Sequence, residues 1–271
     1  MELVASARLR RAQLRIEAMR PYADRMLELM AGTAQAAGAV RLPLLERREN
    51  VQTVAIVPVT GDRGLAGAFN AQVLRRAFAE MRDAQAAGQQ VRFFTSGKKA
   101  QSTVRFRRLD LGQSWTGFSD RPAYSDAQAI AHALAEAYVE GEVDRVLLVY
   151  NAFVSPLVQK VTVSEVLPVS AELLAGAPAD EPKHPVDFFF EPEPRQILER
   201  LLPVYVETEL YRALLESAAS EQGARMTAMR NASKSAGELI DTLTLAMNRA
   251  RQAEITQEIL EVVAGADALT Q

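Results

Sequence analysis

The apolar positions near the C-terminal end of the chain follow the spacing of a long helix. From Met229, alternate steps of three and four residues reach only apolar positions as far as Ala253, which is the heptad pattern of a coiled coil. The pattern predicts one helix from about Glu207 to Ala268, roughly 90 Å long at 1.5 Å per residue. No proline interrupts the run after Pro203. We call its apolar positions the C-terminal seam: Met229, Ala232, Ala236, Leu239, Leu243, Ala246, Ala250 and Ala253.

Residues 2–37 predict a second long helix with a seam of its own. Its apolar positions, at steps of four and three, are Ala5, Leu9, Ala12, Ile16, Met19, Ala23, Met26 and Met30. Pro21 lies inside the pattern and is expected to kink the helix or remove one hydrogen bond. A helix packed on a globular core would show a similar stripe, but two seams at opposite ends favour an intramolecular antiparallel pair. Met1 to Val4 contain no N-cap signal, so we expect this helix to begin before Met1.

The middle of the chain alternates between short β-branched runs and amphipathic segments. This alternation predicts an α/β fold built on an open sheet. A polar stretch at 112–124 reads as irregular, and 175–195 reads as a proline-rich acidic connector anchored by Phe188, Phe189 and Phe190. Strands are expected at 51–60, 91–95, 143–153 and 158–167, and helices at 69–87 and 126–140, with a basic helical segment opening at Ser96.

Composition narrows the function classes. The chain has 271 residues, 48% hydrophobic and only 6% aromatic, which favours helical packing rich in alanine and leucine. Its 31 basic and 34 acidic side chains lack the basic excess of non-specific nucleic-acid binders. The absence of cysteine excludes disulfides and thiolate metal sites, and His132 and His184 are too few for a histidine zinc site. No apolar stretch approaches the roughly 18 residues of a membrane span, and no signal peptide is visible. We therefore expect a soluble protein or a peripheral subunit in a reducing compartment.

The strongest candidate for a ligand site is the glycine-rich loop Gly61–Gly67, which lies between a predicted strand and a predicted helix. A phosphate could bind at such a helix N-terminus. The loop matches neither the Walker A pattern nor the dinucleotide fingerprint, so a turn without a ligand is the simpler interpretation. No serine lies in a nucleophile elbow, and Glu191 and Glu193 read as solvated charges of the connector.

A cluster of polar residues lies near the end of the last helix, at Arg251, Gln252, Thr256, Glu258 and Glu261. Arg251 with Glu254 forms an i,i+3 pair worth roughly 0.2–0.5 kcal/mol on an isolated helix. The cluster is also compatible with contacts to a partner, and spacing alone does not separate the two interpretations.

Several segments of the chain resemble the gamma subunit of F-type ATP synthases. The tail from Ile255 to Ala268 is similar to the C-terminal signature of that family. The resemblance extends in order over nearly the whole chain. Its other segments are Leu3-Val4-Ala5 with Arg8-Leu9-Arg10 and Gln13, Asp62 to Gly67 with Phe69-Asn70, Ser220-Glu221-Gln222 with Arg225-Met226 and Ala228-Met229, Leu239-Ile240-Asp241, and Asn248 to Gln252.

The resemblance implies a fold and a function. The fold is a long antiparallel coiled coil of N- and C-terminal helices with an inserted Rossmann-like α/β domain, so the expected parts are 1–40, 50–195 and 196–271. The function is that of a central rotor shaft inside a hexamer of alpha and beta subunits. The end of the shaft outside the hexamer contacts a membrane rotor ring and the epsilon subunit. The delta subunit belongs to the same complex. The implied place is the cytoplasmic face of the bacterial cell membrane, without a transmembrane segment. No catalytic residue, cofactor or metal is implied for the chain itself.

The resemblance also carries residue roles. Arg251, Gln252, Thr256 and Glu258 match family residues that contact beta-subunit loops, and Glu261 is a weaker member of that set. Tyr205 and Glu207 match positions near the rotor ring. The family's N-terminal helix begins earlier than the match to Met1, so its first part is expected to be absent here. Two alternatives from other classes are a nucleotide-binding α/β enzyme with helical arms, which would bind ATP or NAD, and a coiled-coil adaptor.

Overall fold

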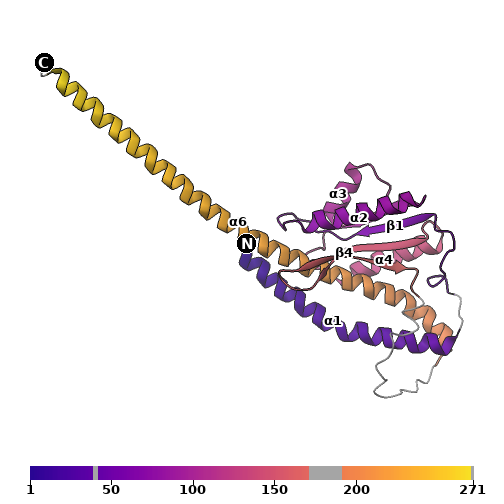
Figure 1. Cartoon of the computed structure of the whole chain (residues 1–271). Coiled ribbons are helices and arrows are strands. Elements are labelled where there is room, and N and C mark those ends of the chain that lie inside the picture. Colours follow the sequence, from indigo (N-terminus) through magenta and orange to yellow (C-terminus); the bar gives the residue numbers. More distant parts are fainter. Residues whose placement is uncertain (39–41, 171–190, 270–271) are drawn as a thin grey trace. The chain divides into compact units, whose positions relative to one another are not determined.

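The computed structural model describes residues 1–38, 42–170 and 191–269 of the chain. The chain divides into two compact units, Met1–Thr227 and Ala228–Gln271. Helix α6 (Pro194–Leu269) contributes to both units. The first unit combines the long helix α1 (Glu2–Ala37), the first part of α6 and an α/β sheet layer (Figure 1).

The α/β part of the first unit alternates strands and helices, as the sequence predicts. Within the described residues, one sheet of five strands has the order β3-β2-β1-β4-β5. The pairs β1–β2, β1–β4 and β2–β3 are parallel, whereas β4 and β5 form an antiparallel pair. The elements are β1 (Thr53–Pro58), α2 (Phe69–Ala86), β2 (Gln90–Ser96), α3 (Lys98–Phe106), β3 (Leu111–Trp115), α4 (Tyr124–Val139), β4 (Arg145–Phe153) and β5 (Gln159–Leu167).

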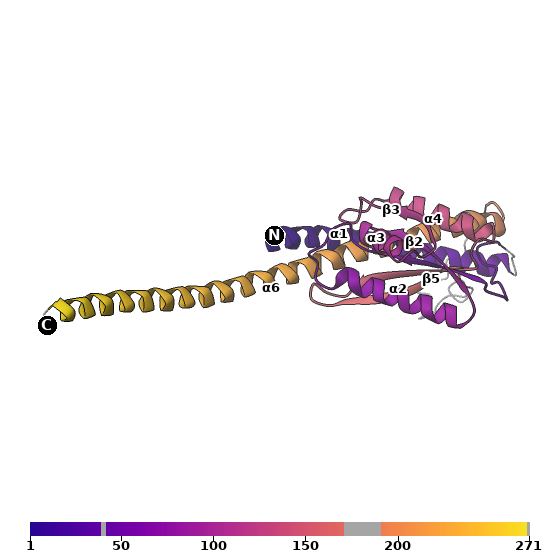
Figure 2. The same ribbon diagram turned by 90° about the horizontal axis from the view of Figure 1, so that it is seen from above.

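Strand β1 shows how the two faces of the sheet are covered. Because successive side chains of a strand point to opposite faces, Val54 and Ile56 pack with Val73 of α2, whereas Ala55 and Val57 belong to the other core. That second core contains side chains of α4 and of both long helices, including Ile130, Leu134, Met30, Leu198 and Leu202. The sheet therefore has α2 and α3 on one face and α4 with the two long helices on the other (Figure 2).

The two long helices form the expected antiparallel pair. Leu9 and Ile16 of α1 are buried against Leu215 and Ala219 of α6, and farther along α1 Met30 belongs to the same core as Leu202 and Leu198. Pro21 lies inside α1 without ending it. The N-terminal seam is thus confirmed as a buried stripe, but the residues that cover it precede the C-terminal seam in the sequence.

Two boundaries differ from the sequence prediction for identifiable reasons. Helix α6 begins at Pro194 and continues through Pro203, because Leu198, Leu202 and Val206 pack into the core at helical spacing. The stretch predicted to be irregular begins with β3, whose half-buried residues pair only with β2 at one edge of the sheet. Most of the predicted connector, with Phe188 to Phe190, lies outside the described residues.

Candidate functional site

The second unit exposes many large apolar side chains. Leu239 and Leu243 of the C-terminal seam are each 58% exposed, and Val262 is 72% exposed. The other exposed members are Ile240, Leu245, Met247, Ile255, Ile259, Leu260 and Val263. Exposed apolar side chains in this number along one helix are typical of a protein interaction site, because water solvates them poorly. The seam was predicted to meet the N-terminal helix, and this part of the prediction is wrong: α1 is buried against Leu215 and Ala219 instead.

The five predicted contact residues lie on two faces of α6. At about 100° per residue, Arg251 and Glu258 are separated by about 20° around the helix axis, and Glu261 lies on the same side. Gln252 and Thr256 lie about 100–140° away from Arg251, on the side of Ile259, whereas Ile255 lies about 40° from Arg251. All five side chains are exposed. The structure therefore presents a charged stripe and a separate mixed polar and apolar stripe.

Local hydrogen bonds already orient part of this surface. Thr256 Oγ1 donates to the main-chain oxygen of Gln252 at 2.8 Å. Gln257 Nε2 donates to Glu261 Oε1 at 3.0 Å. Lone threonine and glutamine contacts of this type stabilise a helix only slightly, so the density of functional groups here is not explained by helix stability.

Tyr205 and Glu207, predicted to lie near a rotor ring, are 7% and 9% exposed. Glu207 Oε2 accepts a hydrogen bond from the hydroxyl of Tyr124 at 2.7 Å, and Gln128 Nε2 lies 3.4 Å from Oε1. Burial, together with this bond to a carboxylate, raises the pKa of Tyr124 well above its ordinary value. The two side chains thus have internal packing roles, and any contact of theirs with another subunit has to include the surface around them.

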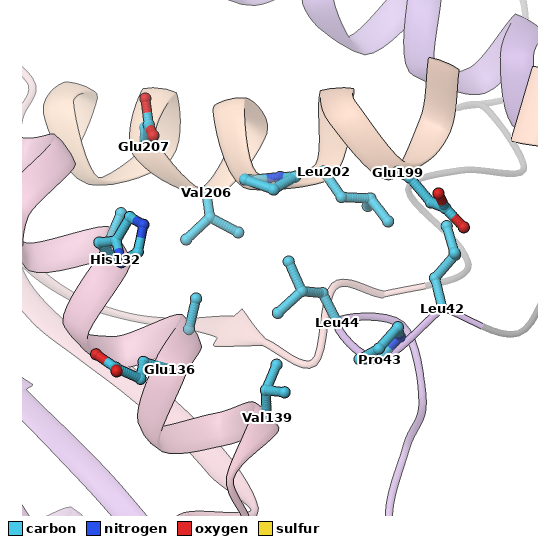
Figure 3. A pocket seen from close by; sticks show the side chains of 13 residues that line it. Leu42, Pro43, Leu44, His132, Glu136, Val139, Glu199, Leu202, Val206 and Glu207 are labelled. Carbon is cyan, nitrogen blue, oxygen red and sulfur yellow. The ribbon is translucent and has the colours of Figure 1, made fainter. Parts of the chain in front are cut away.

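An apolar groove next to Glu207 supplies such a surface. It has a volume of about 380 Å³. Figure 3 shows Leu202 and Val206 of α6 facing Leu44 and Val139 across the groove, with His132 of α4 at one end. The remaining lining residues are Leu42, Pro43, Ala131, Ala135, Glu136, Glu199, Pro203 and Glu207.

The glycine-rich loop is built to hold side chains of its own chain rather than a phosphate. The N–H of Gly61 donates to Asn70 Oδ1 at 2.8 Å, and that of Asp62 donates to Ser119 Oγ at 2.9 Å. A Cβ at Gly61 would lie 2.7 Å from the carboxyl carbon of Glu221. The first two N–H donors of the loop are thus occupied by side chains of the same chain, and a carboxylate, which would repel a phosphate, fills the space beside Gly61. This geometry disfavours the nucleotide-binding alternative.

Sequence reasoning did not predict that three consecutive polar residues of α6, one of which lies against this loop, are buried. Ser220, Glu221 and Gln222 are almost completely buried. Burial raises the pKa of Glu221, although the neighbouring Arg225 guanidinium, which donates to it, acts in the opposite direction. Three consecutive buried polar residues on a helix are a detectable signal, because polar side chains are seldom buried without specific partners.

Neither a membrane-crossing helix nor a metal-binding group is found in the described part of the chain. None of its helices is both long and apolar enough to span a bilayer. No group of three or more histidine and acidic side chains is placed to hold a metal ion among the described residues.

Comparison with known proteins agrees with this architecture. A family model described as ATP synthase matches residues 1–269. The ATP synthase gamma chain of Rubrobacter xylanophilus is 47% identical over 279 residues, covering 99% of this chain and 91% of that relative. The ATP synthase gamma chain of Nostoc sp. is 42% identical over 293 residues, covering 100% of this chain and 93% of that relative.

Solved structures show the same arrangement. A chain of the Tetrahymena thermophila mitochondrial ATP synthase, described as central stalk and c-ring, is 27% identical with a TM-score of 0.61, covering 86% of this chain and 97% of that chain. A chain of the Euglena gracilis mitochondrial ATP synthase has a TM-score of 0.61 at 17% identity, covering 97% of this chain and 95% of that chain, and shows the shared fold. The chain therefore belongs to the ATP synthase gamma chain family, a central-stalk rotor component of a complex whose catalysis resides in the beta subunits.

Proposed function

We propose that the second unit couples rotation of the stalk to the catalytic cycle by pressing on loops of the beta subunits. The observation that carries this proposal is the exposed apolar surface of α6, with large side chains such as Leu239, Leu243 and Ile259 open to solvent. Such a surface needs a protein partner. Arg251, Glu258 and Glu261 on one stripe and Gln252 and Thr256 on the other supply the polar contacts.

The coupling rests on unequal contacts around the helix. A shaft with a charged stripe on one side and a mixed polar and apolar stripe on another presents a different surface to each surrounding subunit. A ligand or partner shifts a conformational equilibrium only by its differential affinity for the two states. Rotation of an asymmetric helix therefore drives each beta subunit in turn between states of different nucleotide affinity, while a uniform apolar rod would favour none of them.

The partners and location follow from the same proposal. The alpha and beta subunits surround the second unit, and the epsilon subunit and the membrane ring contact the first unit near Tyr205, Glu207 and the apolar groove beside them. The delta subunit belongs to the stationary part of the complex. The chain is then a peripheral component on the cytoplasmic face of the bacterial cell membrane, held there by the complex. Support comes from bacterial relatives named ATP synthase gamma chain and from the apolar groove beside Glu207.

Reconstitution with alpha and beta subunits tests the proposal. The chain is expected to form a stoichiometric ATPase complex, and failure to form one would contradict the assignment of partners. In the assembled enzyme, Arg251→Ala and Glu258→Ala should lower ATP synthesis about tenfold, equivalent to about 1.4 kcal/mol, with little loss of assembly.

Matched controls lie on other faces of the same helix. Arg249 lies about 160° from Arg251 around the axis, and Glu238 lies about 160° from Glu258. Arg249→Ala and Glu238→Ala remove the same charges from exposed positions on the side of Thr256, so they should lower synthesis less than Arg251→Ala and Glu258→Ala if the charged stripe carries the coupling. Equal losses in the test and control variants, or equal losses of assembly and synthesis, would indicate a general packing role instead.

A further inference from the structure

Helix α6 makes side-chain contacts on three sides just before the second unit begins, two of them hydrogen bonds and one a close approach to a glycine. Ser220 Oγ donates to the main-chain oxygen of Asn151 in β4 at 3.0 Å. Glu221 meets the glycine-rich loop at Gly61. Gln222 Nε2 donates to Asp120 Oδ1 at 3.0 Å, in the loop after β3. Since consecutive helical residues point about 100° apart, these three contacts surround the helix axis.

The surrounding segments are themselves tied together. Asp62, in the same loop as Gly61, accepts hydrogen bonds from the N–H groups of Lys98 at 2.9 Å, Gly117 at 2.9 Å and Ser119 at 3.1 Å. These bonds fix the loop that carries Asp120 against the glycine-rich loop. Asp120 Oδ2 also accepts from Arg8 Nη1 of α1 at 2.9 Å. The partners of α6 therefore form one connected frame that includes α1 and the sheet.

Directional polar contacts can resist rotation of α6 about its own axis, which apolar packing resists poorly. The α1–α6 core at this level consists of Leu9, Ile16, Leu215 and Ala219, and apolar contacts are non-directional, so they resist separation better than rotation. Hydrogen bonds and ion pairs depend on angle as well as distance. We propose that a collar of polar contacts fixes the rotational setting of α6 and transmits torque from the α/β domain to the helix, an inference that rests on the proposed shaft function. The collar consists of Ser220, Glu221 and Gln222 of α6 with their partners Asn151, Gly61 and Asp120.

Gly61 offers a way to disturb the collar without removing a charge or a hydrogen-bonding group. A methyl group there would lie 2.7 Å from the Glu221 carboxylate, too close for any real Cβ contact, so the carboxylate must move. Gly64 lies in the same loop and has nothing within 4 Å of its Cβ position. Gly64→Ala is therefore the matched control for Gly61→Ala. Glu221→Gln, which keeps the shape but removes the charge that binds Arg225, is a second collar variant in case Gly61→Ala fails to assemble.

The experiment measures both geometry and coupling in the assembled enzyme. Because the chain has no cysteine, spin labels attach only at introduced sites, here Asp83→Cys on α2 and Lys234→Cys on α6, before assembly with the other subunits. The distribution of distances between the labels should widen about twofold in both collar variants and stay unchanged in Gly64→Ala. In membrane vesicles the ions pumped per ATP hydrolysed should fall by about half in the collar variants, with ATP hydrolysis itself retained.

An unchanged distance distribution, or an unchanged pumping ratio, in the assembled collar variants would overturn the inference. A lower melting temperature with both readouts unchanged would show that the contacts serve stability alone. These outcomes are distinct from failure of the proposed function, which would appear as failure of the wild-type chain to assemble with alpha and beta subunits.

Discussion

Asp144 joins the start of the sheet to the segment that precedes it, and Asp144→Asn measures the contribution of its charge. Oδ2 accepts hydrogen bonds from the N–H groups of Gln52 at 2.7 Å and Thr53 at 2.8 Å. Oδ1 accepts from Arg48 Nη1 at 2.5 Å, and Arg48 Nη2 donates to the main-chain oxygen of Tyr138 at 2.6 Å. The carboxylate is nearly buried, so these partners replace its contact with water.

The expected loss follows from which of these bonds survive. The side-chain oxygen of asparagine can still accept from both main-chain N–H groups, but its amide group would face Arg48, so that the charge-assisted bond is lost. Hydrogen bonds to charged groups contribute about 1.5–3 kcal/mol, and an unpaired, partly buried charge adds a penalty. Since Arg48 keeps the Tyr138 oxygen, we expect the free energy of unfolding of the first unit to fall by about 2–3 kcal/mol.

Urea unfolding followed by tryptophan fluorescence measures this change in the first unit. The only tryptophan, Trp115, lies in β3 and packs against the core. With a urea dependence of about 2–3 kcal/mol per molar, the midpoint should fall by about 1 M. Asp110→Asn is the control, because Asp110 is 65% exposed and lies 3.8 Å from Arg92. Its effect should stay within about 0.5 kcal/mol.

The pH dependence gives the same prediction a second test. Burial by itself raises the pKa of Asp144, but the hydrogen bonds from Thr53, Arg48 and Gln52 together lower it below its ordinary value. The contribution is therefore present above the unfolded-state pKa of about 3.9 and is lost as the pH falls through the folded-state value. The wild-type and Asp144→Asn midpoints should converge at low pH. Equal midpoints at pH 7, or a gap that persists in acid, would refute the reasoning.

Two further predictions use the same urea titration. Gly97 has φ +96°, and a Cβ there would lie 2.0 Å from the main-chain oxygen of Thr60, so Gly97→Ala should lower the free energy of unfolding by about 3 kcal/mol or more. Gly88 has φ +78° but open space around its Cβ position, so the control Gly88→Ala should lower it by only about 1 kcal/mol. Similar losses of stability in the two variants would contradict the prediction. Burial raises the pKa of Glu216, although the neighbouring Arg212 acts in the opposite direction. The ionised carboxylate therefore destabilises the fold at neutral pH, and this destabilisation disappears in acid. Glu216→Gln should change the free energy of unfolding more favourably at pH 7 than at pH 4, and the opposite trend would contradict the raised pKa.

Hydrophobic periodicity was sufficient to predict most of the elements but not all of their contacts. The stripe from Ala5 to Met30 predicts a helix, and the structure buries most of that stripe. The β-branched run around Ile56 predicts a buried strand, which it is. Periodicity reports which face of an element avoids water, because that depends only on local spacing. It does not report the partner, so the C-terminal seam was paired with the wrong part of the chain.

The missed boundaries have tertiary causes. Pro203 has no N–H to donate and is unfavourable inside an isolated helix, yet α6 continues through it because Leu202 and Val206 are anchored in the core. The segment Leu111–Trp115 contains Gly112 and two polar residues, so its strand character comes from pairing with β2 rather than from propensity. Neither fact is readable from a short window of sequence.

The contact residues near Arg251 and the collar differ in how they could be predicted. The contact roles of Arg251 and Glu258 were assigned through the resemblance to a family, because hydrophobic periodicity does not distinguish one exposed polar residue of a helix from another. Gln222 was not assigned a role, because its partner Asp120 is 102 positions away in the sequence. Polar partners at such separations are fixed only by the completed fold.

The chemistry of the collar itself argues against a purely stabilising role. Buried ion pairs such as Glu221 with Arg225 are often matched or exceeded in stability by well-packed apolar residues of similar volume, because desolvation offsets much of their attraction. An apolar collar would therefore hold α6 in place equally well. It would not distinguish one rotational setting of the helix from another, whereas the directional hydrogen bonds of Ser220 and Gln222 to two separate segments do, with the Glu221 carboxylate packed against Gly61 between them. Polar residues at this level of α6 are thus better explained by orientation than by stability, which is the property that a rotating helix requires.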